Sequence, residues 1–166
     1  MRNDICYEIC GDGKDLGYWW CDDGNNEAGD GCDAYCHVER GYSCTGGTSV
    51  KADTCTEICG DGVDHLYYQC DDGNLVAGDG CDGSCNIETG WTCFGGTYDT
   101  ADRCFEICGD SIRVSTKTGV CDDGNVIALD GCSRNCEIET GWTCTGGTIT
   151  TRDVCTEICG DGLHRG

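Results

Sequence analysis

Residues 55–62 read CTEICGDG, and similar phrases begin at three other cysteines of the chain. They are CYEICGDG from Cys6, CFEICGDS from Cys104 and CTEICGDG from Cys155, which gives intervals of 49, 49 and 51 residues. A phrase that recurs at a fixed interval of this length is typical of an array in which each copy is one structural unit. The sequence therefore predicts cysteine-rich repeats at residues 6–54, 55–103 and 104–154, and the start of a fourth at 155–166.

Cysteine spacing also predicts how the repeats are joined. Only ten residues separate the last cysteine of one repeat from the first of the next. A bridge between them would close a short loop and fix each junction. The predicted junction bridges are Cys44–Cys55, Cys93–Cys104 and Cys144–Cys155. The four remaining cysteines of each repeat then pair internally, with three connectivities open, and Cys6 and Cys159 are left to pair outside the segment.

The composition explains why so many cysteines are needed. Leu, Ile, Val and Phe make up 25 of 166 residues, and the net charge is −21. Chains this poor in apolar residues and this charged are usually disordered. Cysteine, at 20 of 166 residues, instead indicates a disulfide scaffold. We therefore expect a small disulfide-rich repeat array of irregular loops and turns, with short β-hairpins and no substantial helix.

Local patterns place the hairpins late in each repeat. Short strands are expected at Val38–Cys44, Ile87–Cys93 and Ile138–Cys144. A GGT turn follows each one and leads back toward the next opening cysteine. Asp-Gly pairs throughout the chain favour tight turns, because Gly accepts a positive φ. The aromatic residue at the equivalent position of each repeat is expected to be its apolar anchor: Tyr42, Trp91 and Trp142.

Disulfide density and charge limit where the protein works. Disulfides at this density form in oxidising compartments, so we expect an extracellular or cell-surface location. No apolar run is long enough to span a membrane. The acidic charge argues against partners that need Lys and Arg, namely nucleic acid and anionic lipid. The unfinished fourth repeat suggests a segment of a longer secreted or membrane-anchored protein.

The CDDGN phrase and the aspartate that follows it form a candidate calcium site. Calcium takes six to eight oxygen ligands from carboxylates, amides and backbone carbonyls. Adjacent carboxylates repel one another, which favours a cation between them. The alternative is that these residues only form turns in which side chains cap backbone amides. The candidate ligands are Asp22, Asp23, Asn25, Asp30, Asp71, Asp72, Asn74, Asp79, Asp122, Asp123, Asn125 and Asp130.

Other chemistry is poorly supported by the sequence. The CxxxC spacings differ from the CxxC pairs of zinc sites, and the three histidines occupy non-equivalent positions. No nucleophile elbow, phosphate loop or metalloprotease helix is present. Because the paired aspartates recur in every repeat, they are poor candidates for a single active site. We therefore expect a protein that is not an enzyme.

The combination EICGDG…CDDGN…GDGC…ETGWTCTGG resembles the Myxococcus-type cysteine-rich disulfide repeat over essentially the whole segment. Similar repeats occur in secreted and surface proteins, including mastigoneme proteins, which form hair-like filaments on algal flagella. The resemblance implies an extracellular, modular, non-enzymatic role. The third repeat departs from the pattern at Ser111, Leu129 and Ser133, which weakens the calcium prediction there.

The sequence thus predicts a rigid structural segment of a surface filament or coat, whose partners are copies of itself or other surface proteins. The alternative is a calcium-dependent adhesion or ligand-binding module of a cell-surface protein. A ligand-binding module should gather exposed aromatic residues at one concave site. A filament protein should bury them at repeated contacts between chains.

Overall fold

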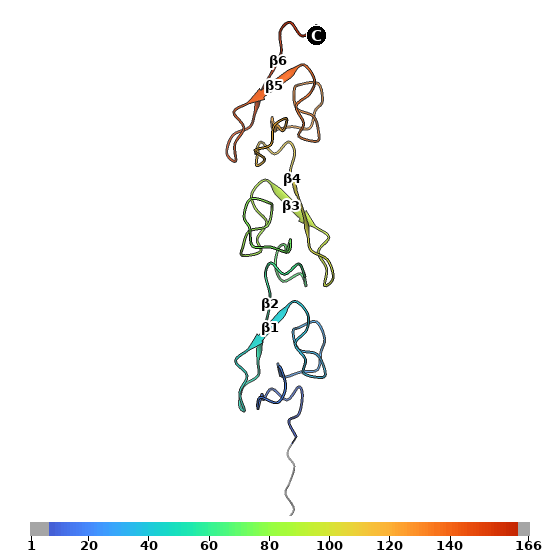
Figure 1. Cartoon of the computed structure of the whole chain (residues 1–166), viewed down its shortest axis with the longest axis vertical. Coiled ribbons are helices and arrows are strands. Elements are labelled where there is room, and N and C mark those ends of the chain that lie inside the picture. The colour runs from blue at the N-terminus through green and yellow to red at the C-terminus, as the bar shows by residue number, and fades with distance from the viewer. Residues whose placement is uncertain (1–6, 163–166) are drawn as a thin grey trace, which may run out of the picture. The chain divides into compact units, whose positions relative to one another are not determined.

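A computed structural model describes residues 7–162, and in this part of the chain all regular structure is short β-strand (Figure 1). Six strands of four residues each form three two-stranded sheets. The pairs are β1 (Tyr42–Thr45) with β2 (Thr54–Glu57), β3 (Trp91–Phe94) with β4 (Arg103–Glu106), and β5 (Trp142–Thr145) with β6 (Val154–Glu157). The fold is therefore a disulfide-rich array of turns, loops and short hairpins, as the sequence predicted.

Each junction cysteine pair lies within one of these hairpins. Cys44 is directly opposite Cys55 in the antiparallel pair β1–β2, and Cys144 is opposite Cys155 in β5–β6. Their Cα atoms are 4.0 Å apart in both pairs, and a disulfide joins each pair. The third predicted bridge, Cys93–Cys104, is also formed. The bridges thus tie the end of one repeat to the first strand of the next.

The strands begin later than the sequence predicted. Val38, Ile87 and Ile138 form only isolated bridges, with Cys32, Cys81 and Cys132 respectively. Regular pairing starts four residues further on, at the aromatic residue of each repeat. The residue before that aromatic is a glycine with φ between 83° and 85°, outside the range of a β-strand, so the chain bends there.

The internal disulfides are nested. In the first repeat Cys10 pairs with Cys36, and the bridge Cys21–Cys32 lies inside that loop. The third repeat has the same arrangement, with Cys108–Cys136 outside and Cys121–Cys132 inside. In the second repeat Cys59 pairs with Cys85, and Cys70 and Cys81 are also disulfide-bonded. The structure thus selects one of the three connectivities that spacing left open. Cys159 is exposed and free, and Cys6 lies outside the described residues.

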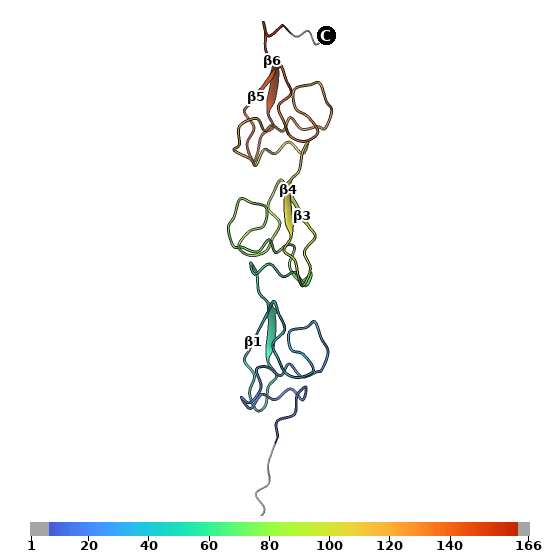
Figure 2. The ribbon, with the colours of Figure 1, turned by 45° about the vertical axis from the view of Figure 1, so that its right-hand side comes forward.

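The described chain packs as two compact units. The first contains the described part of Met1–Leu75 with Gly83–Asn86 and Gly95–Arg103. The second contains Val76–Asp82, Ile87–Phe94 and the described part of Cys104–Gly166. The boundary between the units runs through the second repeat. For β1 and for β5, both views show a rounded loop, formed by residues that precede the hairpin, lying beside it (Figures 1 and 2).

Cystines take the place of an apolar core. Among the described residues, Val63 is the only buried apolar side chain that is not a cysteine. In the first repeat Cys21, Cys32 and Cys36 form the buried cluster, and an equivalent cluster is present in the third. The expected anchors Tyr42, Trp91 and Trp142 are only half-buried. No helix in the described part is long and apolar enough to cross a membrane.

Candidate functional site

The first aspartate of each CDDGN phrase lies inside the fold with its carboxylate fully engaged. Asp71 is 0% exposed, and its Oδ1 accepts hydrogen bonds from the backbone amides of Gly62 at 2.8 Å and Gly73 at 2.9 Å. Its Oδ2 accepts one from the amide of Gly60 at 2.7 Å. Asp22 and Asp122 are buried and bonded in the same way. These carboxylates join the CGDG turn to the CDDG turn, and their oxygens face backbone amides.

A second buried carboxylate, absent from the predicted set, supports the first. Asp102 Oδ2 accepts from the amide of Asp71 at 3.0 Å, and its Oδ1 accepts from the amide of Gly96 at 2.9 Å. The Asp102 amide donates in turn to the Asp71 carbonyl at 2.7 Å. The equivalent residues are Asp53 and Asp153. Each stands two residues before the opening cysteine of the next repeat, and this recurring Asp-x-Cys was the signal that sequence reasoning missed.

The glutamate of the CxxE phrase holds the loop that precedes it in the sequence. Glu88 Oε2 accepts from the amides of Gly78 at 2.7 Å and Gly80 at 2.9 Å. Glu39 and Glu139 make the equivalent pair of bonds in the other repeats. Many of the acidic residues of the chain therefore serve as acceptors for loop amides that have no partner in a strand or helix.

The remaining predicted calcium ligands form a separate group near the surface. Asn125 Nδ2 donates to Asp123 Oδ1 at 3.1 Å and to Asp130 Oδ2 at 3.0 Å. Partial burial, and then the negative charge of Asp130, raise the pKa of Asp123. Asp130 Oδ1 is buried and has no hydrogen-bond partner.

The other two repeats contain parts of the same group. In the first, Asn25 Nδ2 donates to Asp30 Oδ2 at 2.9 Å. Burial and the charge of Asp30 raise the pKa of Asp23. In the second, Asp72 Oδ1 accepts from the Asn74 amide at 3.2 Å. Asp79 lines a hollow beside Trp91.

The predicted calcium ligands are therefore divided between two environments. Asp22, Asp71 and Asp122 are structural acceptors, whereas the second aspartate of the phrase lies close to the aspartate that follows the phrase in the first and third repeats. Within residues 7–162, no three His, Cys, Asp or Glu side chains are grouped so that they could hold a metal ion. Calcium binding stays a prediction, and the pair Asp123 and Asp130 is its best location.

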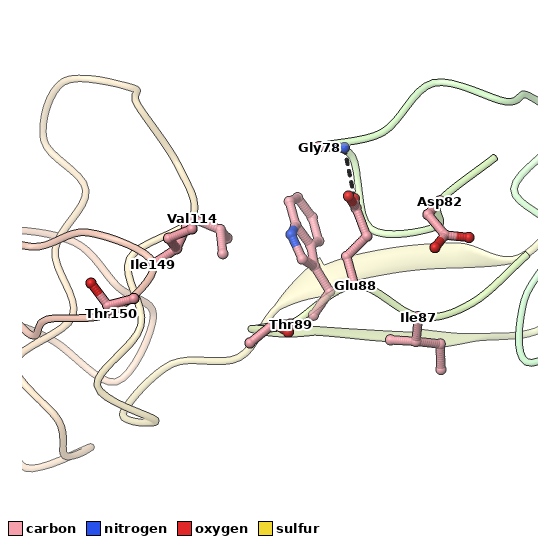
Figure 3. A pocket seen from close by; sticks show the side chains of 9 residues that line it. Gly78, Asp82, Ile87, Glu88, Thr89, Val114, Ile149 and Thr150 are labelled. Atoms are coloured by element: carbon pink, nitrogen blue, oxygen red, sulfur yellow. Dashed lines mark hydrogen bonds between the residues drawn. The ribbon is translucent and has the colours of Figure 1, made fainter. Parts of the chain in front are cut away.

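A hollow flanks the hairpin in each compact unit, built from equivalent positions. The hollow in the second unit has a volume of about 660 Å³, and Trp91, Val114 and Ile149 contribute to its walls. Figure 3 shows Val114 and Ile149 across the hollow from Glu88 and Thr89. The hollow in the first unit, about 500 Å³, has Glu39, Arg40, His65 and Tyr98 at the positions of Glu88, Thr89, Val114 and Ile149. The repeat thus produces the same concave feature twice, with different side chains.

The two hollows differ in the side chains that line them. Arg40 forms an ion pair with Asp99 at 3.2 Å, and the His65 ring lies 4.6 Å from the Tyr42 ring. The second hollow replaces Arg40 by Thr89 and His65 by Val114. Its walls combine apolar side chains, such as Trp91 and Val114, with the polar side chains of Thr89, Asp82 and Glu88.

The first repeat also exposes an aromatic cluster of its own. Trp20 and Tyr35 are each 74% exposed, and their ring centroids lie 5.1 and 6.4 Å from that of His37. His37 Nδ1 is 3.4 Å from Asp33 Oδ2, and backbone hydrogen bonding from His37 lowers the pKa of Asp33. The second repeat has Gln69, Ser84 and Asn86 at these three ring positions, and the third has Val120, Asn135 and Glu137. This cluster is therefore a surface feature of the first repeat and is not part of the structure that the three repeats share.

The recurrent phrases and the nested disulfides define one type of repeat, and comparison with known families identifies it. A family model described as Domain of unknown function (DUF4215) matches residues 1–37, 41–86 and 91–137. The chain belongs to the DUF4215 family. Its three matches cover most of the chain, and the second and third begin at or just before the β1 and β3 hairpins instead of at the cysteines that open the predicted repeats. Comparisons with curated proteins and with solved structures gave no match.

Proposed function

We propose that this DUF4215 segment is non-enzymatic building material of an extracellular filament or surface coat, similar in role to mastigoneme proteins. The observation that carries the proposal is the disulfide-locked hairpin at each junction, repeated at Cys44–Cys55, Cys93–Cys104 and Cys144–Cys155. A covalent link between adjacent strands limits movement where one repeat passes into the next. Repeat proteins with short junctions of this kind provide extended surfaces for contact with neighbours.

The use of the acidic residues supports a structural role. The most deeply buried carboxylates accept hydrogen bonds from backbone amides, so their function is to hold turns. The disulfide content favours folding in an oxidising compartment, which agrees with an extracellular location. The partners that we propose are copies of the same chain or other surface proteins, because the repeated hollows offer equivalent contact positions.

Electron microscopy of cells that produce the protein tests this proposal. A gold-labelled antibody raised against the refolded segment should mark fibres or a coat on intact cells, and the label should not increase after the cells are permeabilised. A pre-immune serum is the matched control. Label found only after permeabilisation, or only on dispersed single molecules, would contradict the proposed role.

A second candidate function, calcium-dependent adhesion, is favoured by one observation. Asp130 Oδ1 is buried without a hydrogen-bond partner, next to the carboxylate of Asp123. A cation would neutralise this pair and supply the missing partner. We propose that calcium binds there if the protein is an adhesion module.

Thermal melting tests the calcium proposal. Millimolar calcium should raise the Tm relative to a chelator, and Asp130→Asn should remove the difference. Asp99→Asn is the control. It removes an exposed carboxylate of a different repeat from Asp130, and it should keep the difference in Tm between calcium and chelator. An equal Tm in calcium and chelator would eliminate this function.

A further inference from the structure

One loop of the third repeat exposes three apolar side chains. Val126, Ile127 and Leu129, which we call the apolar tip, are 52%, 65% and 74% exposed. The first repeat has Asn26, Glu27 and Gly29 at these positions. Exposed apolar side chains that lie close together mark interaction sites more often than single ones do.

The conformation of Leu129 makes the tip more unusual. Its φ is 76°, in the left-handed region that disfavours side chains. The other two repeats place Gly29 and Gly78 there, with φ of 93° and 99°. The Leu129 amide is bonded to Glu139, a role that any residue can fill. The leucine side chain therefore adds strain without being buried, and strain of this kind often accompanies function.

The hollow of the second unit presents apolar side chains beside two carboxylates. Its walls include Trp91, Val114 and Ile149, and Figure 3 shows Val114 and Ile149 on one side of the space. Ile149 is 66% exposed, so its apolar surface is accessible at the mouth. A volume of about 660 Å³ leaves room for aliphatic side chains from outside.

Charge also matches between the hollow and the tip. Asp82 and Glu88 line the hollow and make it acidic. Arg134 is exposed in the turn after the apolar tip. Its equivalent in the second repeat, Gly83, lies against the loop that corresponds to the tip: a Cβ at Gly83 would be 3.0 Å from the Leu75 carbonyl oxygen. A positive side chain thus accompanies the apolar tip, and negative side chains accompany the hollow.

We propose that the apolar tip of one copy inserts into the Trp91–Val114–Ile149 hollow of a second copy, with Arg134 facing Asp82 and Glu88. Tip and hollow are different surfaces, so the contact is heterologous and can add further copies in sequence. This inference rests on the proposed structural role and identifies one contact through which copies would assemble. The net charge of −21 opposes assembly, so salt should strengthen it.

Sedimentation of the oxidised chain over a range of concentrations tests the contact. The wild type should form larger species as concentration and salt rise. Leu129→Gly and Ile149→Ser, which restore the residues of the first repeat, should each raise the concentration needed for assembly by roughly tenfold or more. Val154→Thr, which removes another exposed apolar side chain outside the hollow, is the matched control and should assemble as the wild type does.

Stability separates a contact role from a folding role. Leu129→Gly relieves an unfavourable φ, so its Tm should equal or exceed that of the wild type while its assembly weakens. A lower Tm with unchanged assembly would mean that Leu129 serves the fold, and would overturn the proposal.

Mixing the two variants gives the most specific result. Leu129→Gly keeps an intact hollow and Ile149→Ser keeps an intact tip, so the mixture should form dimers that do not grow further. A mixture that stays monomeric, or that grows like the wild type, would overturn the tip-in-hollow contact. Assembly that persists in both variants would overturn this contact while leaving the structural role intact. A wild type that stays monomeric at every concentration would overturn self-assembly itself.

Discussion

The first aspartate of the CDDGN phrase and the loop tip that follows it are under opposite constraints, although few residues separate them. Asp22, Asp71 and Asp122 are the same residue, equally buried and bonded to three amides each. The tip positions change from Asn26, Glu27 and Gly29 to Val126, Ile127 and Leu129. The comparison shows that the buried carboxylates and the disulfides, which together we call the frame, specify the fold. The exposed loops are free to vary and to specify contacts.

The largest effect should follow from removing a frame carboxylate. Asp71→Ala leaves three backbone amides without their acceptor, at about 1–3 kcal/mol each, so the free energy of unfolding should fall by about 3 kcal/mol or more. The neighbouring change Asp72→Ala removes an acceptor from a partly exposed turn and should cost about 1 kcal/mol or less. Denaturant unfolding of the two variants measures the difference. Equal losses would mean that the frame does not depend on Asp71.

A smaller loss of stability is expected from alanine substitutions at two glycines of one loop, and the two losses should differ. A methyl group at Gly31, where φ is 119°, would lie 2.3 Å from Cys55 Cβ, so Gly31→Ala should lower the free energy of unfolding by about 2 kcal/mol. At Gly29 the φ is 93° and no atom lies within 4 Å, so Gly29→Ala should cost only about 1 kcal/mol. Thermal melts of the two variants compare a glycine that packs against a junction disulfide with a glycine in an open loop. A Gly29→Ala variant as unstable as Gly31→Ala would contradict the division between them.

The smallest effect is one of pH. The fold raises the pKa of Asp123 above its ordinary value of 3.8, so the folded chain binds a proton more readily than the unfolded chain. The contribution of Asp123 to stability therefore decreases as pH rises through the raised pKa. Asp123→Asn should make the chain more stable at neutral pH, and its stability should vary less with pH above 3.8.

Asp33 provides a control of opposite sign. Its pKa is lowered, chiefly by hydrogen bonding from the His37 amide, so its contribution is present above pH 3.8 and is lost as pH falls through the lowered pKa. Asp33→Asn should therefore make the chain less stable at neutral pH. Urea unfolding at several pH values measures both variants, and the same sign for both would refute the assignment.

Cysteine spacing was sufficient to predict the hairpins and the bridges across them, because ten intervening residues leave few other geometries for Cys44 and Cys55. It could not select the nested internal pairing, since the spacing of the four internal cysteines is compatible with all three connectivities. The strand starts were misplaced because a continuous strand was expected from Val38 and from Ile87, and the bends at Gly41 and Gly90 interrupt it.

The site was harder to predict than the fold. Carboxylates that accept from amides and carboxylates that could accept a cation have the same sequence pattern, so Asp71 and Asp72 could not be told apart. Asp102 was missed because its partners, Asp71 and Gly96, lie in other turns of the chain. The sequence alone assigned no role to Arg134 or Leu129. The exposure of both residues and the positive φ of Leu129 are known only from the structure.

Amide hydrogen exchange in the presence of a chelator tests the central claim most directly, namely that buried carboxylates and disulfides hold each repeat without help from an ion. The amides of Gly60, Gly62 and Gly73, which donate to Asp71, should exchange as slowly as global unfolding allows, with or without calcium. Rapid exchange of these three amides, or protection that appears only when calcium is added, would contradict the account.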